Sequence, residues 1–377
     1  MTISPTKMHA HTYGSLDAPD ETITSVFLRS LNALPNRTYI NDGAVSLSIN
    51  DVAHRAASFQ RCLRDYGVER GDVVTLQLPN WWETIVAMHA VWGLGAIVNP
   101  VSHINRGRDL ETIFDLSRPK VIVTPAFYRD VDYPSMIAQA LAAVDHESAV
   151  LTLRDLARPV ALLNVNAEFE VVPCDQDDVS MLMYTSGTTG RPKGVLHSHR
   201  TLLYESKSIA EIFGLHGDSI FMPSPLAHIT GLLYGVLMPL QIGGRVVLMD
   251  RWDPAGAVQL IEEYQCTVTV SATPFLRGLA DQYAKRNGPS SLHTFICGGA
   301  DIPANLVAHA KETMGVSVAR TYGSTEMPTL CVVRPEDEGE IRLITEGRVI
   351  GEARARLTPG SSDIGQLEVQ GPELFVG

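Results

Sequence analysis

The chain has 377 residues and a formal net charge of −12 at pH 7, with 45% hydrophobic and 19% charged residues. This composition is typical of soluble globular proteins, and the length predicts two or three subdomains. The negative charge argues against nucleic acid and anionic membrane surfaces as partners. No apolar run is long enough to span a bilayer, and the N-terminus lacks the core of a signal peptide. The five cysteines are scattered, which fits a reducing cytoplasm better than a disulfide framework or a zinc site.

Predicted helices and strands alternate along most of the chain. In chain order, we expect a helix at 52–66, a strand at 73–78, a helix at 82–92, a strand at 121–124, a helix at 201–213, a strand at 245–249, a helix at 255–264, a strand at 266–270, and helices at 276–286 and 304–314. Such alternation predicts largely parallel sheets covered by helices. From Cys331 onward, short strands with Gly and Pro turns predict a small antiparallel unit.

The most informative stretch is residues 184–199, which read YTSGTTGRPKGVLHSH. Its glycines allow an anion to come close, its hydroxyl side chains donate hydrogen bonds, and Arg191 and Lys193 add positive charge. No Asp or Glu occurs from Val179 through Tyr204. The composition therefore predicts a polyphosphate-binding loop between two short strands, with a polar surface loop as the simpler alternative.

Spacing excludes two common nucleotide-binding loops. A Walker A loop needs Ser or Thr directly after its Lys, but Gly194 follows Lys193. A Rossmann fingerprint must open a helix, and Pro192 disfavours helical geometry in the residue before it.

Residues 184–195 instead resemble the phosphate-loop signature of the acyl-adenylate-forming (AMP-binding) superfamily. That family includes acyl-CoA synthetases, aryl-CoA ligases, luciferases and the adenylation domains of peptide synthetases. Further segments resemble its other motifs in the same order along the chain: PSPLAHITG at 223–231, SATPF at 271–275, CGGA at 297–300 and TYGSTE at 321–326. The resemblance extends over nearly the whole chain.

The resemblance implies the large N-terminal domain of an acyl-CoA synthetase. Its fold would be α/β, with two helix-covered, largely parallel sheets and a small antiparallel β-barrel-like unit. The expected subdomains are residues 1–170, residues 171–325 with the ATP site, and residues 326–377. Relatives continue past this point into a mobile C-terminal domain with a catalytic Lys, which the sequence given lacks, so we expect a truncated form.

The resemblance also assigns candidate site residues. Catalysis is expected to involve Lys193, His228, Thr325 and Glu326. Residues expected to bind ATP are Thr185, Ser186, Gly187, Thr188, Thr189, Gly190, Lys193, Gly298, Gly299, Ala300, Asp301, Thr321, Tyr322, Gly323, Ser324 and Thr325. Residues expected to contact the acid are His228, Gly231, Thr273 and Gly299, and those expected to hold Mg²⁺ are Glu326 and Thr188.

Several of these residues also have ordinary structural explanations. A His among apolar residues is often structural, and residues 271–275 read equally as a strand stopped by a Pro. Residues 297–301 also read as a strand-to-helix turn, with Asp301 as the helix cap and Pro303 in the first turn.

The implied reaction has two steps. A carboxylic acid would react with ATP to give an acyl-adenylate, and coenzyme A would then take the acyl group. No acidic residue occurs from Ile220 to Gly244, which favours a fatty, alicyclic or aromatic acid over an amino acid, with Leu232, Leu233 and Tyr234 as pocket walls. Two alternatives remain: an adenylation domain that loads a carrier protein, and a truncated, non-catalytic module that binds ATP or an acyl-adenylate. A homodimer and a cytoplasmic location complete the expectations.

Overall fold

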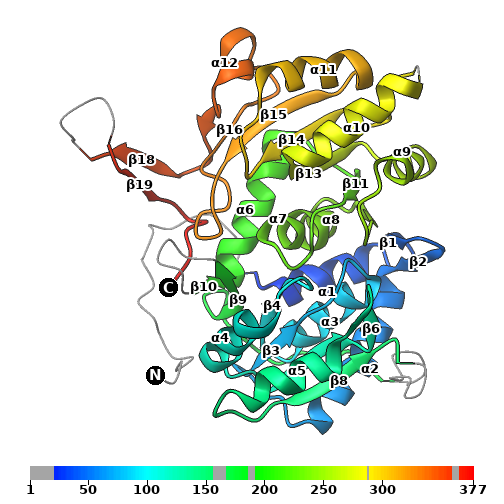
Figure 1. The fold of residues 1–377 in the computed structure, drawn as a ribbon, viewed down its shortest axis with the longest axis vertical. Helices are drawn as coiled ribbons and strands as arrows, with labels where there is room; N and C mark the ends of the chain where they lie inside the picture. The colour runs from blue at the N-terminus through cyan, green and yellow to red at the C-terminus, as the bar shows by residue number, and fades with distance from the viewer. Residues whose placement is uncertain (1–20, 156–166, 186–191, 287, 359–364) are drawn as a thin grey trace.

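The computed structural model describes residues 21–155, 167–185, 192–286, 288–358 and 365–377. Two large β-sheets dominate this part of the chain (Figure 1). One has six strands in the order β10-β9-β4-β3-β5-β8, and the other has nine in the order β17-β16-β15-β14-β13-β11-β12-β1-β2.

The six-stranded sheet is parallel except at one edge. Its strands are β3 (Val73–Leu76), β4 (Ile97–Pro100), β5 (Val121–Pro125), β8 (Ala149–Leu153), β9 (Val179–Thr185) and β10 (Lys193–Ser198). Only β9 and β10 pair antiparallel within it. These two strands are called the phosphate hairpin below, after the phosphate-binding role that the sequence predicts for this region.

Helices cover both faces of the six-stranded sheet. They are α2 (Ile49–Asp65), α3 (Trp82–Gly93), α4 (Gly107–Ser117) and α5 (Tyr133–Ala142). Side chains alternate along a strand, so Val121 and Val123 of β5 join the cluster that contains α2 and α3, whereas Ile122 joins the one with α4 and α5. All five residues of β5 are buried for this reason.

The nine-stranded sheet is parallel at its centre. Its strands are β1 (Thr38–Asp42), β2 (Val45–Ser48), β11 (Ser219–Met222), β12 (Arg245–Leu248), β13 (Val268–Ala272), β14 (Thr294–Gly298), β15 (Ser317–Tyr322), β16 (Cys331–Val332) and β17 (Arg348–Val349). The outermost strands, β2 on one side and β16 with β17 on the other, pair antiparallel. Helices α9 (Pro254–Glu263), α10 (Thr273–Arg286) and α11 (Ala304–Met314) cover one face.

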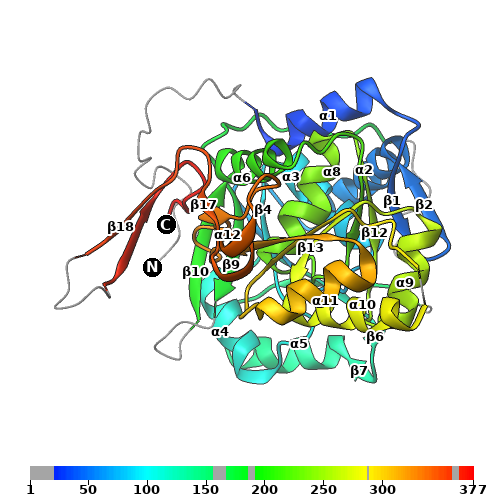
Figure 2. The ribbon, with the colours of Figure 1, turned by 90° about the horizontal axis from the view of Figure 1, so that it is seen from above.

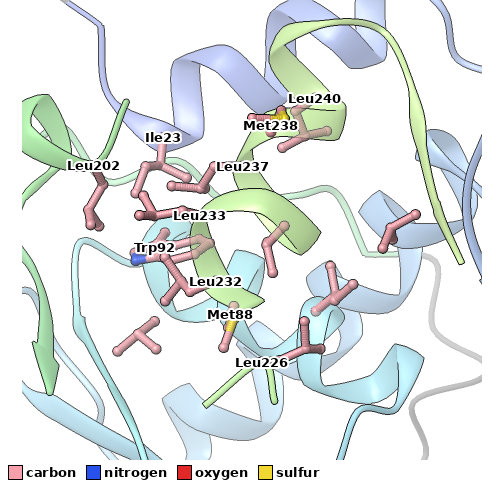
Figure 3. Packing of buried hydrophobic residues seen from close by; sticks show 14 of the residues in the cluster. Ile23, Met88, Trp92, Leu202, Leu226, Leu232, Leu233, Leu237, Met238 and Leu240 are labelled. Atoms are coloured by element: carbon pink, nitrogen blue, oxygen red, sulfur yellow. The ribbon is translucent and has the colours of Figure 1, made fainter. Parts of the chain in front are cut away.

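The opposite face of the nine-stranded sheet shares a core with the six-stranded sheet. The helices in this shared core include α1 (Ile23–Ala33), α3, α6 (His199–Ile212), α7 (Ile229–Leu232), the π-helical turn η1 (Leu233–Leu237) and α8 (Met238–Gln241). Figure 3 shows its side chains meeting from α1, α3, α6 and the helices that follow β11. Its labelled members are Ile23, Met88, Trp92, Leu202, Leu226, Leu232, Leu233, Leu237, Met238 and Leu240. The two sheets are therefore packed together through one continuous apolar layer.

The remaining elements are small. They are β6 (Phe127–Tyr128), β7 (Val131–Asp132), α12 (Gly339–Ile344), β18 (Arg354–Leu357) and β19 (Leu367–Gln370). β18 and β19 form an antiparallel pair that projects from the body in both views (Figures 1 and 2). Among the described residues, no helix is long and apolar enough to cross a membrane.

The expected α/β class with two largely parallel, helix-covered sheets is confirmed. The sheets do not divide at residue 170, because β1 and β2 lie in the nine-stranded sheet and β9 and β10 in the six-stranded one. Antiparallel pairing after Cys331 is present, but β16 and β17 extend the large sheet, and no barrel closes among the residues described.

Candidate functional site

Most of the predicted motifs lie at one edge of the nine-stranded sheet. Strands β11, β13, β14 and β15 run parallel and end at this edge, which we call the carboxyl edge. The last residues of these strands and the segments after them contain His228 and Gly231, Thr273, Gly298 to Asp301, and Tyr322 to Glu326. The carboxyl ends of parallel strands are where open α/β sheets bind ligands. Four motifs that are far apart in the sequence thus come to one place.

The turn after β14 requires glycine. A Cβ on Gly298 would lie 2.6 Å from Thr321 Cγ2 and 2.8 Å from Thr321 O on the neighbouring strand. Gly299 has a φ of +79°, and no atom lies within 4 Å of its ideal Cβ position. The turn therefore lies flat against β15 and leaves open space beside Gly299.

Thr273, the first residue of α10 directly after β13, anchors this turn. Its side chain is buried, and its hydroxyl donates to the Asp301 carbonyl over 3.0 Å. Asp301 is exposed, and the helix cap expected there is wrong: Pro303 is the N-cap of α11, which has no side-chain cap hydrogen bond. Its fixed φ of −61° suits it to the start of a helix.

Residues 322–330 form a tight loop after β15, called the signature loop below. A Cβ on Gly323 would lie 2.0 Å from Pro328 O, so only glycine fits there. Ser324 N donates to Met327 O over 2.8 Å, and Leu330 N donates to Tyr322 O over 2.9 Å. The Tyr322 side chain is 50% exposed, which leaves its ring available for stacking.

Thr325 and Glu326 are half-buried in the signature loop. The Glu326 carboxylate has no hydrogen-bond or ion-pair partner within the described part of the chain. Free carboxylate oxygens are what Mg²⁺ takes from proteins when phosphate supplies its other ligands. No group of three His, Cys, Asp or Glu side chains in the described ranges could hold a metal by itself. The residues present therefore fit a metal shared with a phosphate rather than an all-protein site.

The phosphate hairpin reaches the same region from the six-stranded sheet. Thr185 ends β9 and pairs with Lys193, which is exposed at the start of β10. The predicted ATP residues Ser186, Gly187, Thr188, Thr189 and Gly190 lie outside the described residues.

His197 joins the two sheets at the site, and the sequence analysis missed it. This buried β10 side chain contacts the signature loop: its Nε2 lies 2.8 Å from the Thr325 carbonyl oxygen. Burial lowers the pKa of His197 to about 4. Nothing local in the sequence distinguishes it from a surface His, because its partner lies on another sheet.

The chain's final residues also contact both parts. Phe375 N donates to Glu326 O over 2.8 Å, and Val376 N donates to Leu196 O over 2.8 Å. Leu196 N donates in turn to Gly377 O over 2.8 Å. Residues 375–377 therefore run beside β10 and support the signature loop.

His228 caps the short helix α7. Its Nδ1 accepts a hydrogen bond of 3.3 Å from Thr230 N, and surrounding protein atoms lower the pKa of this imidazole by desolvation although the residue is partly accessible to solvent. A Cβ on Gly231 would lie 2.1 Å from Pro225 O, so the turn that presents His228 is closely packed. The next three residues, Leu232, Leu233 and Tyr234, are buried.

Two further acids that the sequence did not single out lie buried near the signature loop. Glu205 of α6 accepts a 2.6 Å hydrogen bond from Tyr234, and neither Glu373 carboxyl oxygen has a hydrogen-bond partner among the residues that the structure describes. Burial raises the pKa of Glu205 to about 7 and that of Glu373 to about 8. Both carboxyl groups, which the sequence alone would place at the surface, are here part of the interior.

Proteins with similar sequences support the family resemblance of these motifs. The medium-chain fatty-acid–CoA ligase of Escherichia coli is 28% identical over 376 residues, covering 95% of this chain and 66% of the ligase. A feruloyl-CoA synthase of Amycolatopsis is 28% identical over 362 residues, covering 93% of this chain and 70% of the synthase. The chain thus spans about two thirds of the length of these relatives.

The fold agrees as well. The luciferase-like enzyme of the mealworm Zophobas morio has a TM-score of 0.86 at 20% identity, with 97% of this chain and 89% of the other covered. The sequence pattern of the family described as "AMP-binding enzyme" matches residues 27–377. With this match over most of its length, the chain belongs to the AMP-binding enzyme family.

Proposed function

We propose that the protein activates a carboxylic acid with ATP and transfers the acyl group to coenzyme A. The observation that carries the proposal is the contact between the phosphate hairpin and the signature loop. His197 and residues 375–377 link the two, which supports the proposal that Lys193 and the Thr325–Glu326 pair serve one site. Relatives named as CoA ligases for fatty and aromatic acids support this choice of reaction.

In the first step, a carboxylate oxygen of the acid attacks the α-phosphorus of ATP, and the bond to pyrophosphate breaks. Negative charge grows on the α-phosphate oxygens and on the leaving group. Preorganised donors and cations stabilise such charge best where water is excluded. Thr325 is suited to donate to the α-phosphate, and Lys193 to stabilise the leaving pyrophosphate.

In the second step, the thiol of coenzyme A attacks the acyl carbon and AMP leaves. His228 is proposed to orient the acid's carboxylate, and its position at the carboxyl edge, at the start of a closely packed turn, supports this role. Mg²⁺, held by Glu326 and phosphate oxygens, would neutralise phosphate charge. Thr188 stays a predicted second ligand.

The substrate is proposed to be a carboxylic acid with an uncharged fatty, alicyclic or aromatic tail, which suits a role in fatty acid metabolism. No acid occurs from Ile220 to Gly244 to pair with a substrate ammonium. The buried carboxyl of Glu205 comes from α6 and is already bonded to Tyr234. Five free cysteines fit a cytoplasmic location. A homodimer stays a prediction that light scattering would test.

Acid-dependent exchange of labelled pyrophosphate into ATP tests the first step on the 377-residue chain. We expect exchange with simple carboxylic acids and not with amino acids. Lys193→Ala should lower it by about 100-fold. Lys207→Ala, which removes an exposed cation on α6, should not. ATP binding without any exchange would instead support a non-catalytic binding module.

Product analysis separates the acceptors. After adenylation, addition of coenzyme A should give an acyl-CoA and release AMP. Acyl transfer to a carrier protein alone would favour the carrier-loading alternative.

A further inference from the structure

The strongest unassigned feature is the position of His197 between the two sheets. Its Nε2 lies 2.8 Å from the Thr325 carbonyl oxygen, and its Nδ1 lies 2.9 Å from the Thr201 hydroxyl. The residue is 0% exposed. It belongs to β10, whose first residue is Lys193. Side chains alternate along a strand, so Lys193 and His197 share one face of the hairpin.

The hydrogen-bond partners of His197 determine which nitrogen of its ring carries the proton. A carbonyl oxygen only accepts, so Nε2 carries the proton and donates to Thr325. With burial lowering the pKa of this imidazole to about 4, the ring is neutral at pH 7, and Nδ1 is free to accept from Thr201. The same hydroxyl lies 3.1 Å from Ser198 O, a longer contact than the 2.9 Å to the ring.

The acceptor is the carbonyl of a residue proposed to contact ATP. Thr325 is followed directly by Glu326, whose own carbonyl accepts from Phe375 N. These two hydrogen bonds hold adjacent peptide units of the signature loop from two sides. Within the described residues, the His197 bond is the hydrogen bond that joins the loop directly to β10, the strand that starts with Lys193, whereas residues 375–377 join the two indirectly.

We propose that His197 is a positioning residue that fixes Thr325 and Glu326 relative to the phosphate hairpin through its neutral Nε2–H. This inference rests on the proposed adenylation reaction. A displacement of about 1 Å among reacting groups lowers rates by about 100-fold. Loss of the donor should therefore lower kcat for pyrophosphate exchange more than it raises KM for ATP.

Three variants test the donor. His197→Met fills a similar volume without a donor, whereas His197→Gln keeps an N–H at a similar reach. His199→Met is the matched control, because His199 is also buried with a pKa lowered to about 4. Its ring instead accepts from Ile23 N over 3.3 Å and lies 3.7 Å from Cys174 Sγ.

Relative to wild type, we expect His197→Met to lower kcat by about 10-fold to 100-fold. His197→Gln should keep most of the kcat that the Met variant loses. His199→Met should lower kcat by no more than its change in Tm explains. Equal losses of kcat for the two Met variants would overturn the proposal, as would a Gln variant as slow as the Met variant.

Amide hydrogen exchange gives a readout that does not depend on activity. The amides of residues 322–330 should exchange faster in His197→Met than in wild type, and at the wild-type rate in His199→Met. An unchanged rate in His197→Met would overturn the positioning role. If wild-type protein shows no acid-dependent exchange of pyrophosphate but the amide result holds, the proposed reaction fails while the structural link stands.

Discussion

Tyr234 donates a 2.6 Å hydrogen bond to Glu205, and both side chains are buried. Tyr234 lies in the π-helical turn η1, and Thr329 of the signature loop is 3.0 Å from the same hydroxyl. The Glu205 Oε2 atom has no partner in the described ranges. A single polar group thus connects α6, η1 and the signature loop within an apolar layer. π-helical turns often occur at functional sites, and this one follows α7, the short helix that His228 caps.

Tyr234→Phe should destabilise the protein by about 1–3 kcal/mol, because it removes a donor from a buried carboxyl and leaves that group less satisfied. Urea unfolding at pH 7 measures the change. Tyr283→Phe is the matched control: it removes a 2.5 Å bond to Glu262, whose side chain is 21% exposed and also accepts from Ser291 N. An equal loss in the two variants would mean that burial of the acceptor does not decide the effect.

We expect the buried acids Glu205 and Glu373 to make the protein less stable as the pH becomes alkaline. Burial raises their pKa values to about 7 and about 8 from the usual value near 4.5, and the Glu205 carboxylate further raises the pKa of Glu373. The folded state therefore holds these protons more tightly than the unfolded chain does. The stabilisation is complete below about pH 4.5 and is lost as the pH rises through 7 and 8.

Glu373→Gln tests that pH dependence, since an amide cannot ionise. Urea unfolding between about pH 5 and pH 9 should show a flatter decline for the variant than for wild type. Glu368→Gln is the control: the side chain of this β19 residue is 42% exposed, pairs with exposed Arg356, and should keep the wild-type slope. If the Glu373 variant also keeps that slope, the buried carboxyl does not titrate in this range.

The sequence predicted local structure well where apolar runs were sharply bounded. The helix expected at 82–92 is α3 (Trp82–Gly93), and the strand expected at 73–78 is β3 (Val73–Leu76). Pairing between distant strands was not predictable, because periodicity carries no information about which strands become neighbours. The sequence therefore did not reveal that β1 and β2 join the sheet formed mostly by later residues, across the expected boundary at 170.

The same limit applies to the site. The motifs after β11, β14 and β15 were found because each is a local string of residue types. His197, Glu205 and Glu373 were missed because their importance comes from burial and from partners far away in the chain. Asp301 was assigned as a cap from local preference, and the chain uses Pro303 instead.

Gly323→Ala tests how tightly the signature loop must close. The new Cβ would lie 2.0 Å from Pro328 O and 2.7 Å from Met327 O, so backbone must move. We expect a loss of about 1–3 kcal/mol in the free energy of unfolding. Pyrophosphate exchange should fall by about 100-fold, because Thr325 and Glu326 lie on the displaced loop.

Gly288→Ala is the control for that substitution, since no atom lies within 4 Å of its ideal Cβ and its φ is not positive. It should leave stability and exchange near wild-type values. Exchange at the wild-type rate in Gly323→Ala would show that the reaction does not depend on the conformation of this loop.

Glu326→Gln tests the proposed metal ligand, because it keeps the side chain's shape and removes its charge. Mg²⁺ binds through one or two carboxylates together with phosphate oxygens, so loss of the carboxylate should weaken metal binding in the ATP complex. We expect the Mg²⁺ concentration that gives half-maximal pyrophosphate exchange to rise by about 10-fold or more, which corresponds to the loss of one charge-assisted contact. Glu336→Gln makes the same change in net charge at an exposed position and should leave the Mg²⁺ dependence unaltered. If both variants follow the wild-type Mg²⁺ curve, Glu326 does not hold the metal, and its half-buried position in the signature loop serves the backbone contact with Phe375 alone.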